Sequence, residues 1–147
     1  MATTATITLS SDITPGFGGI TKSMTLTQAA TTTDIEETTG FSRRKLTATT
    51  IKDLIIMADA SLIQETDDNT AHKVYVKNLG DGKGNINKDT YVTIGIGDSS
   101  GTPQEIGRLY GGDWMLFPVT GVDGKDVTAA PSTDDAVVLE YVMFYEI

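Results

Sequence analysis

The side chains that most often perform enzymatic chemistry are scarce in this sequence of 147 residues. There is no cysteine, which excludes disulfides, zinc–thiolate sites, iron–sulfur clusters and thiol nucleophiles. The single histidine, His72, begins a predicted strand, and no nucleophile-elbow motif accompanies it. Carboxylates are numerous enough for a two-carboxylate hydrolase site, but most lie in turn-forming clusters, where aspartate serves turn geometry. The sequence therefore predicts a protein that is not an enzyme, with no catalytic residues and no cofactor.

Three glycine- and aspartate-rich segments have the composition of ion- or phosphate-binding loops but the wrong spacing. In Asp81–Asp89, a calcium loop would need an oxygen ligand where Lys83 stands and a glycine where Ile86 stands. Gly95–Gly101 contains a GxG, without the third glycine of GxGxxG and without a following helix. Gly121–Asp126 lacks both the spacing and the hydroxyl residue of a Walker loop. We predict turns in these segments and no metal site.

The segment Tyr110–Trp114 (YGGDW) places two aromatic residues beside a double glycine. A double glycine permits a tight turn or the close approach of another chain. Tyr110 and Trp114 are residue types that stack on sugars or anchor protein interfaces. The alternative is a core tryptophan next to a hairpin turn, and the sequence leaves both interpretations open.

The net charge of the chain is −9, and its one dense cationic run is Arg43, Arg44 and Lys45. Nucleic-acid binding depends on basic surface, so nucleic acid is not an expected partner. The cationic run forms either a solvated strand face or ion pairs with an acidic neighbour. We predict partner contacts at these three residues and at Tyr110 and Trp114.

The sequence contains no predicted targeting or membrane segment. Neither a basic region nor an apolar region follows Met1, so we expect no secretory signal peptide. No uncharged apolar run approaches the ~20 residues of a spanning helix, so we expect no membrane partner.

Residue types are distributed unevenly along the chain. All nine valines, the only tryptophan and all five tyrosines follow Lys73, whereas 16 of the first 50 residues are threonine. Threonine favours strands, and its hydroxyl tolerates water or a polar interface. We therefore predict a threonine-rich arm with added strands in residues 1–70, which needs other material to lie against, and a β-sandwich core in residues 71–147.

Short segments of alternating polarity, separated by glycine, proline and asparagine turns, predict an all-β fold. Their spacing of about 8–12 residues is typical of a sandwich or barrel, and we expect a jelly-roll-like sandwich. Residues 50–64 fit either a helix or two short strands, and the surrounding pattern favours strands. The last segment, 137–147, is so apolar that it must lie centrally in a sheet or be covered by a partner.

Three groups of strand residues, Val74–Asn78, Ile106–Pro118 and Leu139–Phe144, resemble those of small all-β virion structural proteins of tailed bacteriophages, particularly marine and cyanobacterial ones. Those proteins commonly have a YVKN strand, a glycine–acid–aromatic turn before a proline, and a terminal LEYxxF strand. The resemblance spans residues 71–147 and implies a virion structural protein without catalytic residues.

Within that group, we expect a capsid decoration (cement) protein that binds the major capsid protein and forms a homo-oligomer. A tail, neck or fibre component is the alternative within the group. A carbohydrate-binding module for host recognition, using Tyr110 and Trp114, is the alternative outside it.

Overall fold

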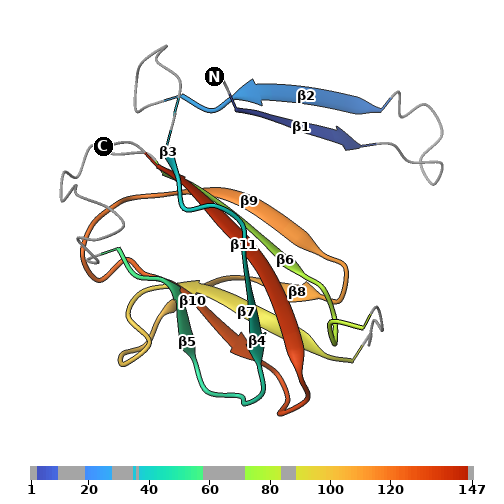
Figure 1. Cartoon of the computed structure of the whole chain (residues 1–147), viewed down its shortest axis with the longest axis vertical. Coiled ribbons are helices and arrows are strands. Elements are labelled where there is room, and N and C mark those ends of the chain that lie inside the picture. The colour runs from blue at the N-terminus through green and yellow to red at the C-terminus, as the bar shows by residue number, and fades with distance from the viewer. Residues whose placement is uncertain are drawn as a thin grey trace.

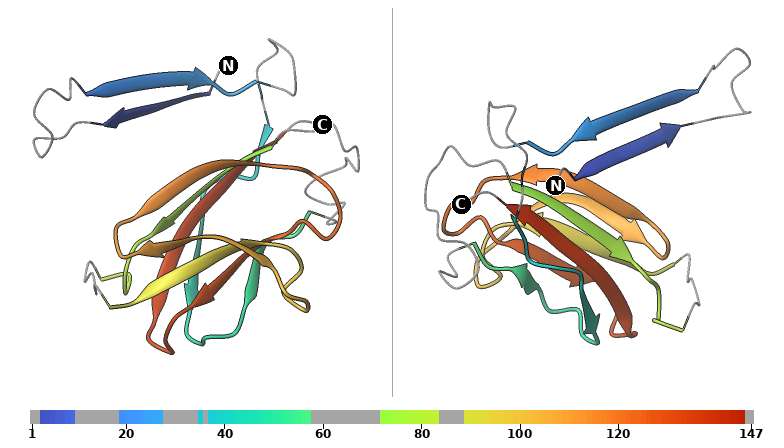
Figure 2. Two further views of the ribbon diagram at one scale, coloured as in Figure 1. Left: turned by 180° about the vertical axis from the view of Figure 1, so that it is seen from behind. Right: turned by 45° about the horizontal axis from the view of Figure 1, so that its top comes forward.

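The computed structural model describes residues 3–9, 19–27, 35, 37–57, 72–83 and 89–145 (Figure 1). These residues form eleven strands and no helix, which confirms the predicted all-β class. Two sheets pack face to face as a β-sandwich, and a separate two-stranded hairpin lies beside them (Figures 1 and 2). No helix of the described residues is long and apolar enough to span a membrane.

All strand pairs are antiparallel. The four-stranded sheet has the order β5 (Lys52–Ile55), β10 (Val127–Pro131), β7 (Tyr91–Ile96) and β8 (Gln104–Tyr110). In the five-stranded sheet, β3 (Glu37–Thr38) and β4 (Ser42–Leu46) both pair with β11 (Val137–Tyr145), which is followed by β6 (His72–Asn78) and β9 (Trp114–Val119). We call the remaining pair, β1 (Thr4–Leu9) and β2 (Ile20–Thr25), the arm hairpin.

The alternation of side chains along each strand explains why two layers form. In β6, Val74 and Val76 are fully buried between the sheets. Lys73, Tyr75 and Lys77, which alternate with them, point to the opposite face. Inward-facing residues of the other strands complete the same interior. The buried members of the core are Leu46, Leu54, Ile55, Met57, Val74, Val76, Val92, Ile94, Leu109, Val119, Val127, Ala129, Val137, Leu139 and Met143.

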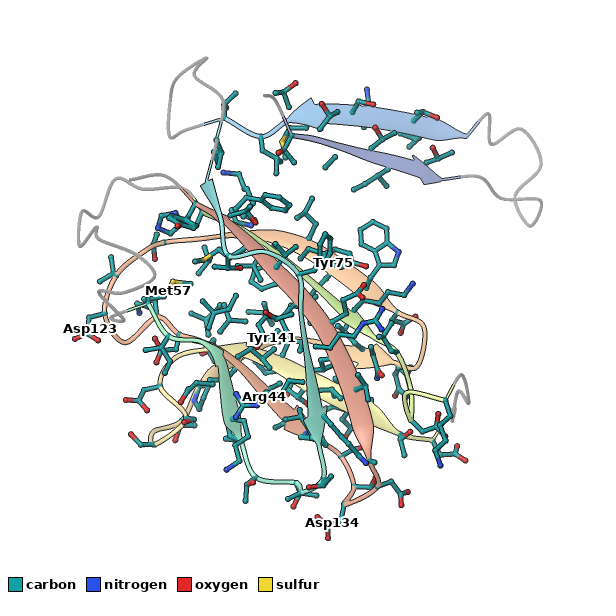
Figure 3. All side chains as sticks on the ribbon, viewed as in Figure 1. Arg44, Met57, Tyr75, Asp123, Asp134 and Tyr141 are labelled. Carbon is teal, nitrogen blue, oxygen red and sulfur yellow. The ribbon has the colours of Figure 1, made fainter. Side chains whose placement is uncertain are left out.

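Most connections pass the chain from one sheet to the other, and two of them, the β8–β9 turn and the β4–β5 connection, have contacts that fix the crossing. The β8–β9 turn contains Gly112 at φ +96°, a conformation that L side chains rarely adopt, and Asp113 N–H donates to the Tyr110 carbonyl at 2.9 Å. The β4–β5 connection crosses in the other direction. Beside it, Arg44 donates a hydrogen bond from Nη1 to the carbonyl of Asp53, so that this guanidinium links the two sheets (Figure 3).

A smaller buried cluster lies outside the sandwich interior. Val142 points away from the four-stranded sheet but is only 1 % exposed, as are Leu26 and Ile35. The Ile35 N–H donates to the Leu26 carbonyl at 3.0 Å. Leu26, which follows β2, also lines the same groove as Val142, so it lies over part of the outer face of the five-stranded sheet.

Two expectations about strands can be compared directly with this arrangement. The apolar final strand is central, with β6 on one side and β3 and β4 on the other, as predicted. In the ambiguous segment 50–64, Lys52–Ile55 forms a strand, so the helical alternative is wrong there; residues 58–64 lie outside the described part. Of the strands within residues 1–70, β3, β4 and β5 complete the two sheets, and β1 and β2 stand apart.

Candidate functional site

The outer face of the five-stranded sheet, which is turned away from the four-stranded sheet, carries an apolar row. Val142 lies opposite Tyr75, and Tyr75 lies opposite Leu116, so these three outward side chains cross three strands. Phe144 and Pro118 lie in the next row. Outward positions of sandwiches are ordinarily polar, so an apolar outer face indicates a surface that contacts other material.

Three aromatic rings on this face form what we call the aromatic strip: Phe41, Tyr75 and Trp114. The ring centroids of Phe41 and Tyr75 are 6.1 Å apart in an edge-to-face arrangement, and those of Tyr75 and Trp114 are 6.2 Å apart. Phe41 is 70 % exposed and Trp114 is 48 % exposed. Figure 3 shows Tyr75 on the side of the sandwich nearer the arm hairpin, while Tyr141 lies between the sheets. Exposed rings of this kind are typical anchors of interfaces.

A row of charged side chains borders the aromatic strip. Arg43 of β4 binds one carboxylate oxygen of Glu140, with Nε at 2.9 Å and Nη2 at 2.8 Å, and Lys77 lies opposite Glu140 on β6. Because the Arg43 side chain is 67 % exposed, this pair contributes about 0–1 kcal/mol. Burial, and then the negative charge of Glu140, raises the pKa of the Tyr75 phenol.

Two grooves separate the arm hairpin from the outer face. The first, of about 320 Å³, is lined by Thr3–Ile7 of the arm and by the aromatic strip. The second, of about 400 Å³, runs between Ile7 and Met24 of the arm and Leu116 and Pro118 of β9. The arm hairpin thus faces the sheet without filling the space between them.

The arm hairpin has one hydroxyl face and one apolar face, because residues directly opposite in an antiparallel pair share a face. The Thr6 and Ser23 hydroxyls, for example, hydrogen-bond each other at 2.9 Å. On the apolar face, Ile7, Ile20 and Met24 remain 41, 42 and 51 % exposed. A two-stranded hairpin is marginally stable on its own in water, so contacts beyond this chain would stabilise the arm. The hydroxyl face comprises Thr4, Thr6, Thr8, Thr21, Ser23 and Thr25, and the apolar face comprises Ala5, Ile7, Ile20 and Met24 together with Lys22.

The structure separates the predicted contact residues from one another. Arg43 and Lys45 point to the outer face, whereas Arg44 is half-buried between the sheets, because neighbours in a strand point to opposite faces. Tyr110 belongs to the four-stranded sheet, where its ring lies 5.5 Å from that of Tyr91. Trp114 lies on the other sheet, so Tyr110 and Trp114 do not form one stacking platform. The alternative of a core tryptophan is wrong, because this indole is 48 % exposed.

Two side chains that complete the aromatic strip with Trp114 were not singled out from the sequence. Tyr75 had a visible signal, because it alternates with Lys73 and Lys77 on the polar side of its strand. Phe41 had none: it precedes a short strand in a polar segment. It meets Tyr75 only because β11 lies between β4 and β6.

The segments that were tested for ion and phosphate binding form turns where they are described. Gly101 N–H donates to the Asp98 carbonyl, and Lys125 N–H donates to the Val122 carbonyl, each at 3.0 Å. Residues 84–88 of the Asp81–Asp89 segment lie outside the described part. Among the described residues, no three histidine or acidic side chains are grouped to hold a metal ion.

One buried carboxylate has a shifted titration. Burial is the largest cause that raises the pKa of Asp126. The Met57 N–H, which donates to Oδ1 at 2.8 Å, opposes the rise. The negative charges of Asp53, Asp98 and Asp123 add to it. A raised folded-state pKa means that the ionised carboxylate destabilises the fold, and protonation at lower pH removes this cost.

Asp126→Asn should therefore increase stability at neutral pH, because the amide oxygen still accepts the Met57 hydrogen bond without a charge. The gain over wild type should shrink as the pH falls from about 7 to about 4, towards the unfolded pKa of aspartate. Urea unfolding across this range measures the gain. Asp135→Asn, at an exposed carboxylate that does not contribute to the Asp126 shift, is the control; an equal gain at all pH values would contradict the assignment to Asp126.

The chain was also compared with known proteins. No family model matches it, and neither a curated protein nor a solved structure does so.

Proposed function

We propose that this protein is a structural protein of a virus particle, a capsid decoration protein that binds the major capsid shell and itself through the arm hairpin. The exposure of the arm hairpin is the observation that supports a binding role. All six residues of β2 are exposed, and three apolar side chains of the hairpin are 41–51 % exposed. The virion assignment follows from the resemblance of the strand motifs to virion structural proteins.

The mechanism of binding would be strand addition combined with burial of apolar area. A strand with an unpaired edge supplies main-chain hydrogen bonds to a neighbouring sheet, and its alternate side chains fill the neighbour's pockets. A capsid repeats one site many times, so weak contacts of an oligomer add up to strong avidity. The same logic applies to a tail, neck or fibre component, which differs in the surface that is bound.

Removal of Met1–Thr25 should abolish binding to purified empty shells, measured by co-sedimentation. The sandwich should stay folded, because none of its core residues comes from the arm hairpin. Thermal unfolding followed by circular dichroism checks this. The control is Arg108→Ala on the outer face of the four-stranded sheet, where the guanidinium lies 4.7 Å from the Tyr91 ring; it should bind as wild type does.

Undiminished binding after the deletion would contradict the role of the arm. The aromatic strip would then be the contact surface. The same strip fits the second candidate function, a carbohydrate-binding module, because exposed aromatic rings stack on sugars. In that case Trp114→Ala, rather than the deletion, should remove binding.

A further inference from the structure

We propose that β2 is a self-pairing edge: a second copy of this chain adds its own β2 in antiparallel orientation, about a two-fold axis at Ser23. The two arm hairpins then form one four-stranded sheet. This inference deepens the proposed function, on which it rests for the idea that the protein assembles through its arm, and it names the partner and the register.

The backbone groups that point away from β1 can be assigned from one hydrogen bond. Leu26 N–H donates to the Thr3 carbonyl at 2.8 Å, so this pair, which continues the β1–β2 register, is a hydrogen-bonded pair. Hydrogen-bonded and non-hydrogen-bonded pairs alternate in an antiparallel ladder. It follows that Thr21, Ser23 and Thr25 direct their N–H and C=O groups to the outer edge of β2.

This outer edge is the one that faces away from the sandwich. In all three ribbon views β1 lies between β2 and the sandwich (Figures 1 and 2). Thr3–Ile7 line the first groove against the five-stranded sheet, and Lys22–Met24 of β2 line the second. Both strands thus turn one face to the sheet, while every residue of β2 stays exposed and its outer edge meets no described strand. No other described strand pairs with β2.

The edges of the two larger sheets contain features that discourage pairing with another chain, and β2 lacks most of them. The other arm strand, β1, lacks them as well, but it lies between β2 and the sandwich (Figures 1 and 2). Natural edge strands are protected by charges, proline, bulges or short length. The protective features here are Glu105 and Arg108 in β8, Pro118 in β9, a register shift at Val127/Thr128 beside β5, and Arg43 and Lys45 in the short strand β4. In contrast, β2 pairs with β1 over six residues without a register shift, and it has no proline and one charge, Lys22.

The distribution of side chains selects one register. Two copies of β2 keep their hydroxyl and apolar faces aligned only if the axis passes through a residue. With the axis at Ser23, Thr21 faces Thr25 of the second copy, and all the outward N–H and C=O groups named above find partners. With the axis at Lys22, two ammonium groups face each other and Thr25 loses its partner, which disfavours that register.

Charge also favours the arm over the rest of the surface as the site of self-association. The described arm residues, 3–9 and 19–27, contain one charged residue, Lys22, while the whole chain has a net charge of −9. Two acidic sandwiches repel each other, and contact through the arms keeps them apart. Salt screens this repulsion, so the dimer should strengthen as salt rises, whereas ion-pair association through Arg43 or Lys45 should weaken.

Sedimentation velocity of the full chain tests whether two copies pair through the outer edge of β2. Wild type should show a concentration-dependent dimer, and Ser23→Pro should be monomeric, because proline removes an outward N–H without removing a bond to β1. Thr6→Pro is the matched control: Thr6 is the β1 partner of Ser23, and its N–H points to the opposite edge, so this variant should still dimerise.

Thiol cross-linking tests the register, because the chain has no cysteine of its own. With a short bismaleimide, Ser23→Cys should give covalent dimers in high yield, and Thr25→Cys, which faces Thr21 of the second copy, should give few. More cross-linking at Lys22→Cys than at Ser23→Cys would overturn the register.

Two results would overturn the self-pairing itself. One is a wild-type chain that stays monomeric at every protein concentration and salt concentration. The other is a Ser23→Pro variant that dimerises as wild type does. These assays contain no capsid. Their failure is therefore distinguishable from failure of shell binding, which the deletion of Met1–Thr25 measures separately.

Discussion

Leu139→Ala is expected to destabilise the fold by about 3 kcal/mol, because the side chain is fully buried and the sandwich closes only partly around the cavity left behind. Leu139 lies on the central strand β11, between Asn78 on β6 and Arg44 on β4, so its loss affects the centre of the five-stranded sheet. Urea unfolding should give a lower midpoint with an unchanged slope.

Trp114→Ala is the matched comparison, since it removes a larger side chain from an exposed position. We expect a cost of about 1 kcal/mol or less, because the indole is 48 % exposed and contacts the Tyr75 ring outside the core. Circular dichroism should follow both variants, since Trp114→Ala removes the only tryptophan. If Trp114→Ala cost as much as Leu139→Ala, the outer-face position of the indole would be wrong.

Asn78→Ala is expected to cost about 2–4 kcal/mol, although the residue is polar and ends a strand. The Asn78 side chain is 2 % exposed; its Nδ2 donates to the Leu109 carbonyl at 2.9 Å, and its Oδ1 accepts from Gly80 N–H at 2.8 Å. Alanine leaves both backbone groups buried without these partners. Because Leu109 belongs to β8 and Gly80 follows β6, the loss also loosens the junction of β6 with β8.

Gln104→Ala provides the control for Asn78→Ala, since Gln104 carries the same amide group on an exposed part of β8. Its unfolding midpoint should stay within about 0.5 kcal/mol of wild type. A small effect of Asn78→Ala would mean that water reaches Gly80 N–H and the Leu109 carbonyl, contrary to their burial in this structure.

The sequence predicted the strands of the sandwich well, because alternation along one strand is a local property. Val74 and Val76 differ in polarity from their neighbours, and the valine-rich last strand could only be stable at a central position. The strands of the arm were also visible, since apolar and hydroxyl residues alternate strictly in Ala5–Leu9, although the sequence did not predict that the two strands pair as a hairpin. Each of these features depends on residues within a few positions of one another.

The composition of the candidate site was not predictable, because it depends on the order of the strands. Phe41 and Tyr75 are distant in sequence and meet only through the β4–β11–β6 arrangement. The cationic run was misjudged in the opposite way. Arg43, Arg44 and Lys45 are adjacent in sequence and were therefore expected to contact a partner together. Alternation places Arg44 between the sheets and leaves Arg43 to pair with Glu140. Asn78 gave no signal of burial, because its hydrogen-bond partners lie on other segments.

The pairing of β3 with the end of β11 has a practical consequence for fusion proteins. Thr38 lies opposite Phe144, so the last described residues emerge beside the segment that leads back to the arm (Figure 1). A domain appended to the carboxyl end would lie near the arm hairpin and would crowd the docking that we propose for it. The β10–β11 turn, which contains exposed Asp134, lies at the far end of the sandwich (Figure 3). An epitope displayed there would project away from the arm and leave it unobstructed.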